Sequence, residues 1–186
     1  MATITGTATG ETLDGTRLQD DIFGLGGDDT IRGYGGNDTI DGGTEDDFLI
    51  GRTGSDIYWV DSELDKVVER LGEGDTDTVF ATISFTLRRN IENLELRGEA
   101  ARGYGNDLAN RLTVEEGQVV RNVLNGRGGA DFMSGGRGSD IYYVDSVGDT
   151  VTDAGGSDRD KIVSSVSYTL PSIPPDTGDR GWRSRI

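Results

Sequence analysis

Residues 24–41 read GLGGDDTIRGYGGNDTID, two nine-residue units in which glycine stands first, aspartate sixth and isoleucine eighth. The period continues on both sides without a slip, and six units in phase begin at Gly6, Gly15, Gly24, Gly33, Gly42 and Gly51. The sixth position is acidic in every unit: Glu11, Asp20, Asp29, Asp38, Asp47 and Asp56. Such self-similarity is typical of a solenoid, in which each unit stacks on its neighbours.

Each unit divides naturally into a six-residue turn and a three-residue strand. Glycine permits the tight turn, and one apolar side chain per strand faces inward. Two units then make one 18-residue coil, so the sequence predicts an all-β fold, a parallel β-roll (β-solenoid) with a thin core between two sheets. Units two apart stack on the same edge. We therefore expect one ladder of Asp20, Asp38 and Asp56, and another of Glu11, Asp29 and Asp47.

Composition limits both stability and function. The 186 residues carry 34 acidic against 18 basic side chains, a net charge of −16, with no cysteine and no histidine. Leu, Ile, Val and Phe make up about 23% of the chain, just above the roughly 20% below which charged chains are disordered. The sequence excludes disulfides, zinc fingers and Ser-His or Cys-His nucleophiles, has no membrane span, and disfavours nucleic acid as a partner.

The stacked acids point to a hard cation. Neighbouring coils of a parallel sheet lie about 4.8 Å apart, where two carboxylates repel by roughly 1 kcal/mol in water and several times more in a protein. Calcium binds six to eight oxygens at about 2.3–2.6 Å, from carboxylates and backbone carbonyls. We therefore expect calcium binding to supply folding free energy.

The units GLGGDDTIR, GYGGNDTID, GRTGSDIYW, GRGGADFMS and GGRGSDIYY resemble the repeats-in-toxin (RTX), or haemolysin-type calcium-binding, family. The resemblance implies that each ion is held by the Asp and turn carbonyls of one unit and by those of the unit two further on. One ion would lie among Leu25, Gly27, Asp29, Gly42, Thr44 and Asp47. A second would lie among Tyr34, Gly36, Asp38, Gly51, Thr53 and Asp56. A third would use Thr16, Leu18, Asp20, Gly33, Gly35 and Asp38, so that Asp38 bridges two ions.

The chain is an internal duplication. GSDIYWVDS at 54–62 returns as GSDIYYVDS at 138–146. We expect a first array at 6–59, a β-rich connector at 60–104, a degenerate second array at 105–143, a second connector at 144–170 and an irregular tail at 171–186. The second array has Asn122, Asp131 and Asp140 at sixth positions, and one calcium site is expected between Asn122 and Asp140.

The connectors contain the alternating segments FATISFTL at 80–87 and VSSVSYTL at 163–170, which predict strands, as does IENLELRG at 91–98. Tyr58, Trp59, Tyr142 and Tyr143 are expected to close the open end of each array against water, with stacking on sugar rings as the alternative.

The leading hypothesis is a secreted, non-enzymatic calcium-binding protein that folds on meeting calcium outside the cell. The first ten residues do not form a secretory signal, and the resemblance implies type I secretion machinery as a partner. The alternative is a calcium-dependent carbohydrate- or matrix-binding module of a polysaccharide-modifying system. An enzyme is the third hypothesis, although no catalytic motif is present.

Overall fold

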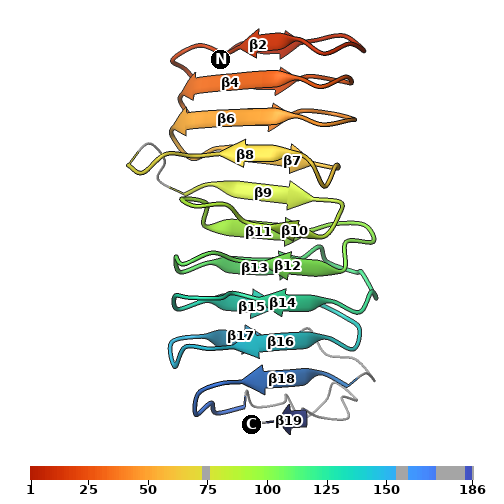
Figure 1. Ribbon diagram of the computed structural model, residues 1–186, viewed down its shortest axis with the longest axis vertical. Helices are drawn as coiled ribbons and strands as arrows, with labels where there is room; N and C mark the ends of the chain where they lie inside the picture. The colour runs from red at the N-terminus through yellow and green to blue at the C-terminus, as the bar shows by residue number, and fades with distance from the viewer. Residues whose placement is uncertain (73–75, 154–158, 171–182, 186) are drawn as a thin grey trace.

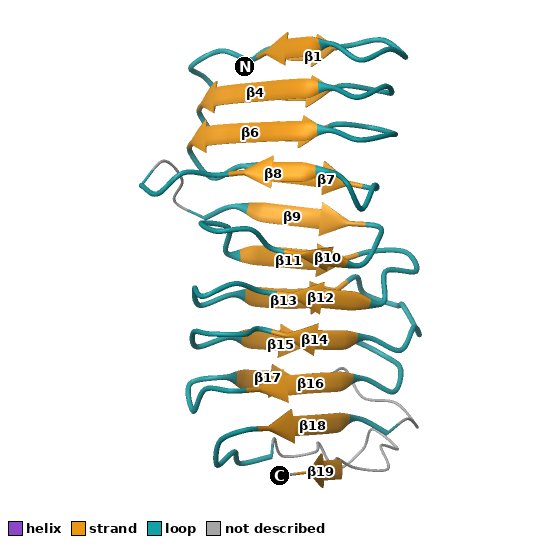
Figure 2. Ribbon diagram, viewed as in Figure 1, coloured by secondary structure: helices purple, strands orange, loops and turns teal. Residues whose placement is uncertain are grey.

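The computed structural model describes residues 1–72, 76–153, 159–170 and 183–185, and the described residues form strands and turns without a helix. The chain winds into a stack of strands that runs from β1 at one end to β19 at the other (Figures 1 and 2). This is the parallel β-solenoid that the repeat predicts. None of the described segments has the helical length and apolar character that a membrane crossing requires.

One face of the solenoid is a continuous parallel sheet of nine strands, taken from alternate positions along the chain. Its strands, in spatial order, are β1 (Thr3–Thr5), β3 (Asp21–Phe23), β5 (Thr39–Asp41), β7 (Ile57–Val60), β9 (Thr78–Ala81), β11 (Asn93–Leu96), β13 (Arg111–Val114), β15 (Phe132–Ser134) and β17 (Thr150–Thr152). Because this sheet passes through both arrays and through β9 and β11 of the first connector, the connector continues the solenoid.

The opposite face consists of two sheets. The first contains β2 (Thr12–Asp14), β4 (Thr30–Gly35), β6 (Phe48–Thr53) and β8 (Lys66–Val68). The second contains β10 (Phe85–Thr86), β12 (Arg102–Tyr104), β14 (Val123–Asn125), β16 (Ile141–Val144), β18 (Lys161–Ser164) and β19 (Arg183–Arg185). This face is therefore interrupted between β8 and β10, inside the first connector.

The register places the eighth-position side chains of successive coils on top of one another. Ile22 pairs with Ile40 in one sheet, and Ile31 pairs with Leu49 in the other. These four side chains and Tyr58 have no exposed surface. The predicted thin core, one buried apolar side chain per strand, is confirmed for β3 to β6, whereas β11 buries both Leu94 and Leu96.

Insertions change the coil length without breaking the stack. The ladder step from Asp56 to Asp77 spans 21 residues, against 18 for each regular step. The step from Asn110 to Asp131 also spans 21 residues, which accounts for the three extra residues between repeats of the second array. The added residues are accommodated in turns, so the strand register is preserved.

Three local expectations differ from the structure. FATISFTL is not one strand but is divided between β9 and β10, with a corner that carries the chain from one face to the other. In VSSVSYTL only the first two residues belong to a strand, β18. In the tail, Arg183–Arg185 form β19, and the rest of the predicted irregular segment lies outside the described residues.

The aromatic residues do not close the ends of the arrays. Tyr58 pairs with Val79 and Tyr142 with Ile162, so the stack continues beyond both tyrosines, whose side chains are fully buried. Trp59 lies on the outer surface, where the Arg97 guanidinium stacks over its ring at 4.7 Å. The prediction that these residues cap an open end was wrong, because the connectors supply further coils.

Candidate metal centres

The repeat acids form the two predicted ladders. Each acid immediately precedes a strand, and from Asp29 to Asp56 its Oδ1 accepts a hydrogen bond from the backbone N–H of the acid one coil earlier. These N···O distances are 2.9 Å from Asp20 to Asp38, 2.7 Å from Asp38 to Asp56 and 2.9 Å from Asp29 to Asp47. The five aspartates of these ladders are buried, with Asp38 only 1% exposed. One oxygen of each carboxylate is therefore committed to holding the coils in register.

The second carboxylate oxygen is different, because in several repeats it has no partner. The buried Oδ2 atoms without a hydrogen bond include those of Asp29, Asp38, Asp47, Asp56 and Asp131. A buried, unpartnered anionic oxygen costs several kcal/mol. Carboxylate oxygens are also the ligands that calcium prefers, so the donor set fits this ion.

The backbone of these turns has a repeating conformation. The second and fourth residues of a turn both have positive φ: Leu25 and Gly27, Tyr34 and Gly36, Gly43 and Glu45, Arg52 and Gly54, Arg127 and Gly129, and Gly136 and Gly138. Leu25, Tyr34 and Arg52 adopt φ of 74–78° although positive φ is strained for side chains other than glycine. We call the turns that begin at Gly24, Gly33, Gly42, Gly51 and Gly126 open turns, because in each the aspartate Oδ2 is unpartnered.

The first glycine of an open turn has a steric role. A Cβ built on Gly24 would overlap the Asp29 carboxylate and the Gly42 carbonyl. A Cβ built on Gly33 would overlap the Asp38 carboxylate and would lie 3.1 Å from the Gly51 carbonyl. The structure thus brings together the carboxylate of one unit and a carbonyl of the unit two further on, as the resemblance implied for the first two ions.

Other proposed carbonyl ligands also lie at the contacts between coils. The Leu25 carbonyl accepts the Thr44 N–H at 3.2 Å, and the Thr53 carbonyl accepts the Gly36 N–H at 2.9 Å. The Tyr34 carbonyl accepts the Thr53 hydroxyl at 3.3 Å. Because a carbonyl has two lone pairs, each of these oxygens keeps one for a metal ion. Gly27 packs on the turn at Thr9 and Gly10.

The turns at the N-terminal end are closed, meaning that a backbone N–H of the same turn donates a hydrogen bond to the second oxygen of the acid. Thr16 donates its N–H to Asp20 Oδ2 at 2.7 Å, and Thr7 donates its N–H to Glu11 Oε2 at 2.9 Å. The turn containing Thr16 and Leu18 lacks the positive-φ pattern, while Gly33 and Gly35 of the same predicted ion belong to an open turn. The third expected ion would therefore lie between a closed turn and an open turn.

The pKa of Asp20 shifts in the opposite direction to the pKa values of the open-turn aspartates. Burial, reinforced by the charges of ladder neighbours, raises the pKa of Asp38 and of Asp47 to about 7. Burial also raises the pKa of Asp56 and of Asp131 to about 6. At Asp20 burial acts in the same direction, but hydrogen bonds from Thr16 and Ala2 outweigh it and lower the pKa. A cation bound at the open turns would offset the burial and mutual repulsion of these carboxylates.

In both ladders of the second array an asparagine precedes an aspartate. Asn122 donates its backbone N–H to Asp140 Oδ1 at 2.7 Å and its side-chain amide to the Ala100 carbonyl at 2.9 Å. Its buried Oδ1 has no hydrogen-bond partner. Asp131 accepts the Asn110 N–H at 2.8 Å in the other ladder. An amide oxygen brings no charge, so a site using Asn122 is expected to be weaker.

Four ladder residues were missed by the sequence reasoning: Asp65, Asp77, Asp149 and Asp160. Asp65 and Asp149 follow Asp47 and Asp131 at the regular spacing of 18, a signal that was available in the sequence. Asp77 follows Asp56 after 21 residues and Asp160 follows Asp140 after 20, so insertions concealed them. The Oδ2 of Asp65 accepts N–H groups from Asp61 and Ser62, which closes that turn.

An open cleft of about 680 Å³ lies where the second face is interrupted between β8 and β10. Its lining includes Val67, Glu69, Leu87, Arg88, Arg89, Asn90 and Arg127. Three arginines thus gather on one surface of a strongly acidic chain.

Comparison with known proteins agrees with this geometry. The RTX calcium-binding nonapeptide repeat matches in four copies, at residues 5–40, 14–49, 33–65 and 121–151. The chain is also 39% identical over 57 residues to the Endo-1,3-1,4-beta-glycanase ExsH of Rhizobium meliloti (strain 1021). That similarity covers 31% of this chain and 12% of the glycanase. RTX nonapeptide repeats bind calcium, and residues 5–65 and 121–151 of this β-solenoid belong to that repeat family.

Proposed function

We propose that this chain is a secreted, non-enzymatic β-roll whose folding is switched on by calcium outside the cell. The observation that carries the proposal is the run of buried, unpartnered Oδ2 atoms in the open turns. Without a cation, stacking these turns costs desolvation and repulsion at each ladder step. With calcium, the same oxygens become ligands, so binding free energy becomes folding free energy.

Two ions are supported best, because each would lie between two open turns. The first would use Asp29 and Asp47 with carbonyls of Leu25, Gly27, Gly42 and Thr44. The second would use Asp38 and Asp56 with carbonyls of Tyr34, Gly36, Gly51 and Thr53. The third ion, at Asp20, is a weaker proposal, since Thr16 already donates to the Asp20 carboxylate.

The affinity for calcium determines whether the chain folds inside or outside the cell. Extracellular calcium modules bind with dissociation constants of about 10⁻⁴ to 10⁻³ M. A β-roll in this range would stay largely unfolded at cytosolic calcium levels and fold where calcium is millimolar. Export by a type I system as a flexible chain, followed by folding at the destination, would then be one process.

The test is circular dichroism of the purified chain during a calcium titration, with magnesium as the control. Calcium should produce a cooperative gain of strand signal. Magnesium should substitute poorly, because it demands octahedral geometry and holds its waters. A chain that is equally folded in chelator and in calcium would contradict the proposal.

A second candidate function is binding of an acidic polysaccharide in the cleft between β8 and β10. It is supported by the three clustered arginines, because guanidinium groups pair with carboxylates in bidentate fashion. The test is binding to uronic-acid polysaccharides with and without calcium, comparing Arg88→Ala and Arg89→Ala with the exposed control Arg17→Ala. Equal binding by all three variants, or no binding by the parent chain, would remove this candidate.

A further inference from the structure

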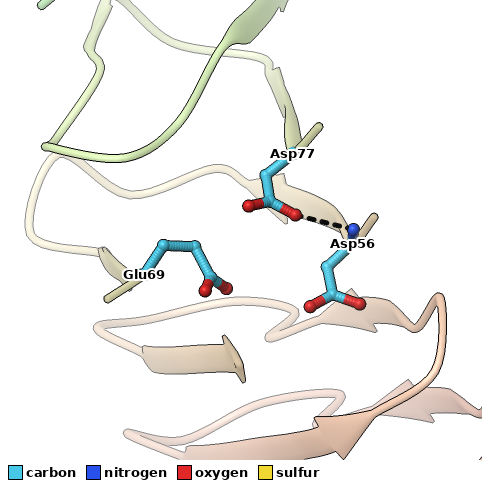
Figure 3. Close-up of side chains that lie close together, drawn as sticks. All are labelled: Asp56, Glu69 and Asp77. Atoms are coloured by element: carbon cyan, nitrogen blue, oxygen red, sulfur yellow. Dashed lines mark hydrogen bonds between the residues drawn. The ribbon is translucent and has the colours of Figure 1, made fainter. Parts of the chain in front are cut away.

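We propose an additional calcium site at the junction of the first array and its connector, formed by the carboxylates of Asp56, Glu69 and Asp77 (Figure 3). Only Asp56 belongs to a repeat column. Glu69 and Asp77 lie in the connector, so this site extends the proposed function beyond the nonapeptide repeats.

The spacing of the three groups suits a single ion. One carboxylate oxygen from each residue lies within 4.8 Å of the other two. Two oxygens bound to one calcium ion at about 2.4 Å can be at most about 4.8 Å apart, so the three groups meet the pairwise limit for sharing one ion. The carboxylates converge from three separate segments of the chain (Figure 3).

Each residue leaves one buried oxygen without a partner. Asp56 is 1% exposed, Glu69 6% and Asp77 0%. The atoms Asp56 Oδ2, Glu69 Oε2 and Asp77 Oδ2 are buried and accept no hydrogen bond. The ion pairs found among the described residues involve Arg32 and Arg97, and none includes this triad. Three buried acids without a cation are strongly unfavourable, which is the second and independent indication of a ligand.

The remaining oxygens hold the side chains in place. Asp77 Oδ1 accepts the Asp56 N–H at 2.8 Å. Glu69 Oε1 accepts N–H groups of Gly51 at 3.2 Å and Arg52 at 3.1 Å, together with the Tyr58 hydroxyl. The ligand atoms are therefore oriented by hydrogen bonds from the backbone and a buried phenol, as in preorganised metal sites.

Glu69 has a clear reason to be acidic. It stands 18 residues after Gly51, where the next regular repeat would have its first glycine. The chain then departs into the longer step that ends at Asp77, so a regular glycine turn does not follow. In the proposed site, the Glu69 carboxylate supplies an oxygen at the position where a regular repeat would have its first glycine. Glu69 also lines the open cleft between β8 and β10.

The second copy of the duplication repeats the arrangement. Asp140, Asp153 and Asp160 occupy the matching positions, and their carboxylate oxygens also lie within 4.8 Å of one another. Asp153 is shorter than Glu69, but the charge of the triad is unchanged. The site is thus a property of the array–connector junction.

The experiment measures calcium stoichiometry and affinity by equilibrium dialysis for the full chain and for Glu69→Gln. The glutamine Oε1 can keep the three hydrogen bonds, and its amide can donate to Asp56 or Asp77, so the fold should persist. Loss of the third charge should weaken one site at least about tenfold. Glu63→Gln, the same charge change at an exposed connector position, should leave every site unchanged.

The outcomes separate this site from the repeat sites. If Glu69→Gln binds the same number of ions with the same affinities, the junction site is refuted and the repeat sites stand. If the parent chain binds only the ions that Glu69→Gln loses, the repeat sites are refuted instead. Should Glu69→Gln fail to fold, anomalous scattering from crystals of the parent chain with terbium decides. A terbium ion among the three carboxylates supports the site, and its absence there overturns it.

Discussion

Asp38→Asn should have opposite effects on stability in the absence and presence of calcium. Asp38 lies between Asp20 and Asp56, about 4.8 Å from the coil on either side. At that distance each pair of charges repels by about 1 kcal/mol in water and about 3–4 kcal/mol at an effective dielectric of 20. The rise of its pKa from 3.8 to about 7 corresponds to about 4 kcal/mol above neutral pH.

Asparagine removes this charge while keeping the shape. Its Oδ1 can still accept the Asp20 N–H, which lies at 2.9 Å in the parent chain. In chelator at about pH 8, we therefore expect the free energy of unfolding to rise by about 1–4 kcal/mol. In calcium, the loss of a charged ligand should move the folding midpoint to at least about tenfold higher calcium.

The assay is circular dichroism in two titrations. A neutral osmolyte, which favours the compact state, is titrated in chelator to compare apo stabilities, and calcium is titrated without osmolyte. Asp28→Asn, an exposed charge in the neighbouring turn, serves as the control and should change neither midpoint much. The reasoning is refuted if Asp38→Asn is no more stable than the parent in chelator, or folds at the same calcium concentration.

Four further predictions concern the turns, the core and pH. Gly24→Ala should cost more than about 2 kcal/mol, because its Cβ overlaps the Asp29 carboxylate and a backbone carbonyl, whereas Gly128→Ala, whose nearest neighbours lie 3.6 and 3.7 Å away, should stay within about 0.5 kcal/mol in urea unfolding. Leu49→Ala should cost about 2–5 kcal/mol in calcium, and a smaller loss would mean that the core collapses around the cavity. Asp38→Ala should raise the calcium midpoint more than Asp131→Ala, since Asp131 has closed turns on both sides in its ladder; equal midpoints would contradict the pairing of open turns. In chelator, stability should be greatest near pH 4 and fall as pH rises through about 7, because burial raises the carboxylate pKa values in the folded state above those of the unfolded chain. In osmolyte titrations at a series of pH values, a rise in stability over this range would contradict the sign.

Much of the fold was predictable because the repeat is local. A nine-residue period with glycine first and an apolar residue eighth fixes the turn, the strand and the stacking of alternate units, which is why Ile22 and Ile40 pair as expected. The connectors were harder to predict. FATISFTL has the alternation of one strand, but the coil needs a corner there, so the stack divides it between two sheets.

The sequence by itself determined the solenoid, the two acid ladders and the choice of calcium, since each follows from which residues recur at a fixed spacing. Tertiary structure decided which acids are available to an ion. Asp20 and Asp38 occupy the same repeat column, yet Thr16 donates a hydrogen bond to Oδ2 of Asp20, whereas Oδ2 of Asp38 has no hydrogen-bond partner. Tertiary structure also brought Glu69 and Asp77 to Asp56, because insertions remove the period but leave the coils in register, and only the folded stack shows which oxygens then meet.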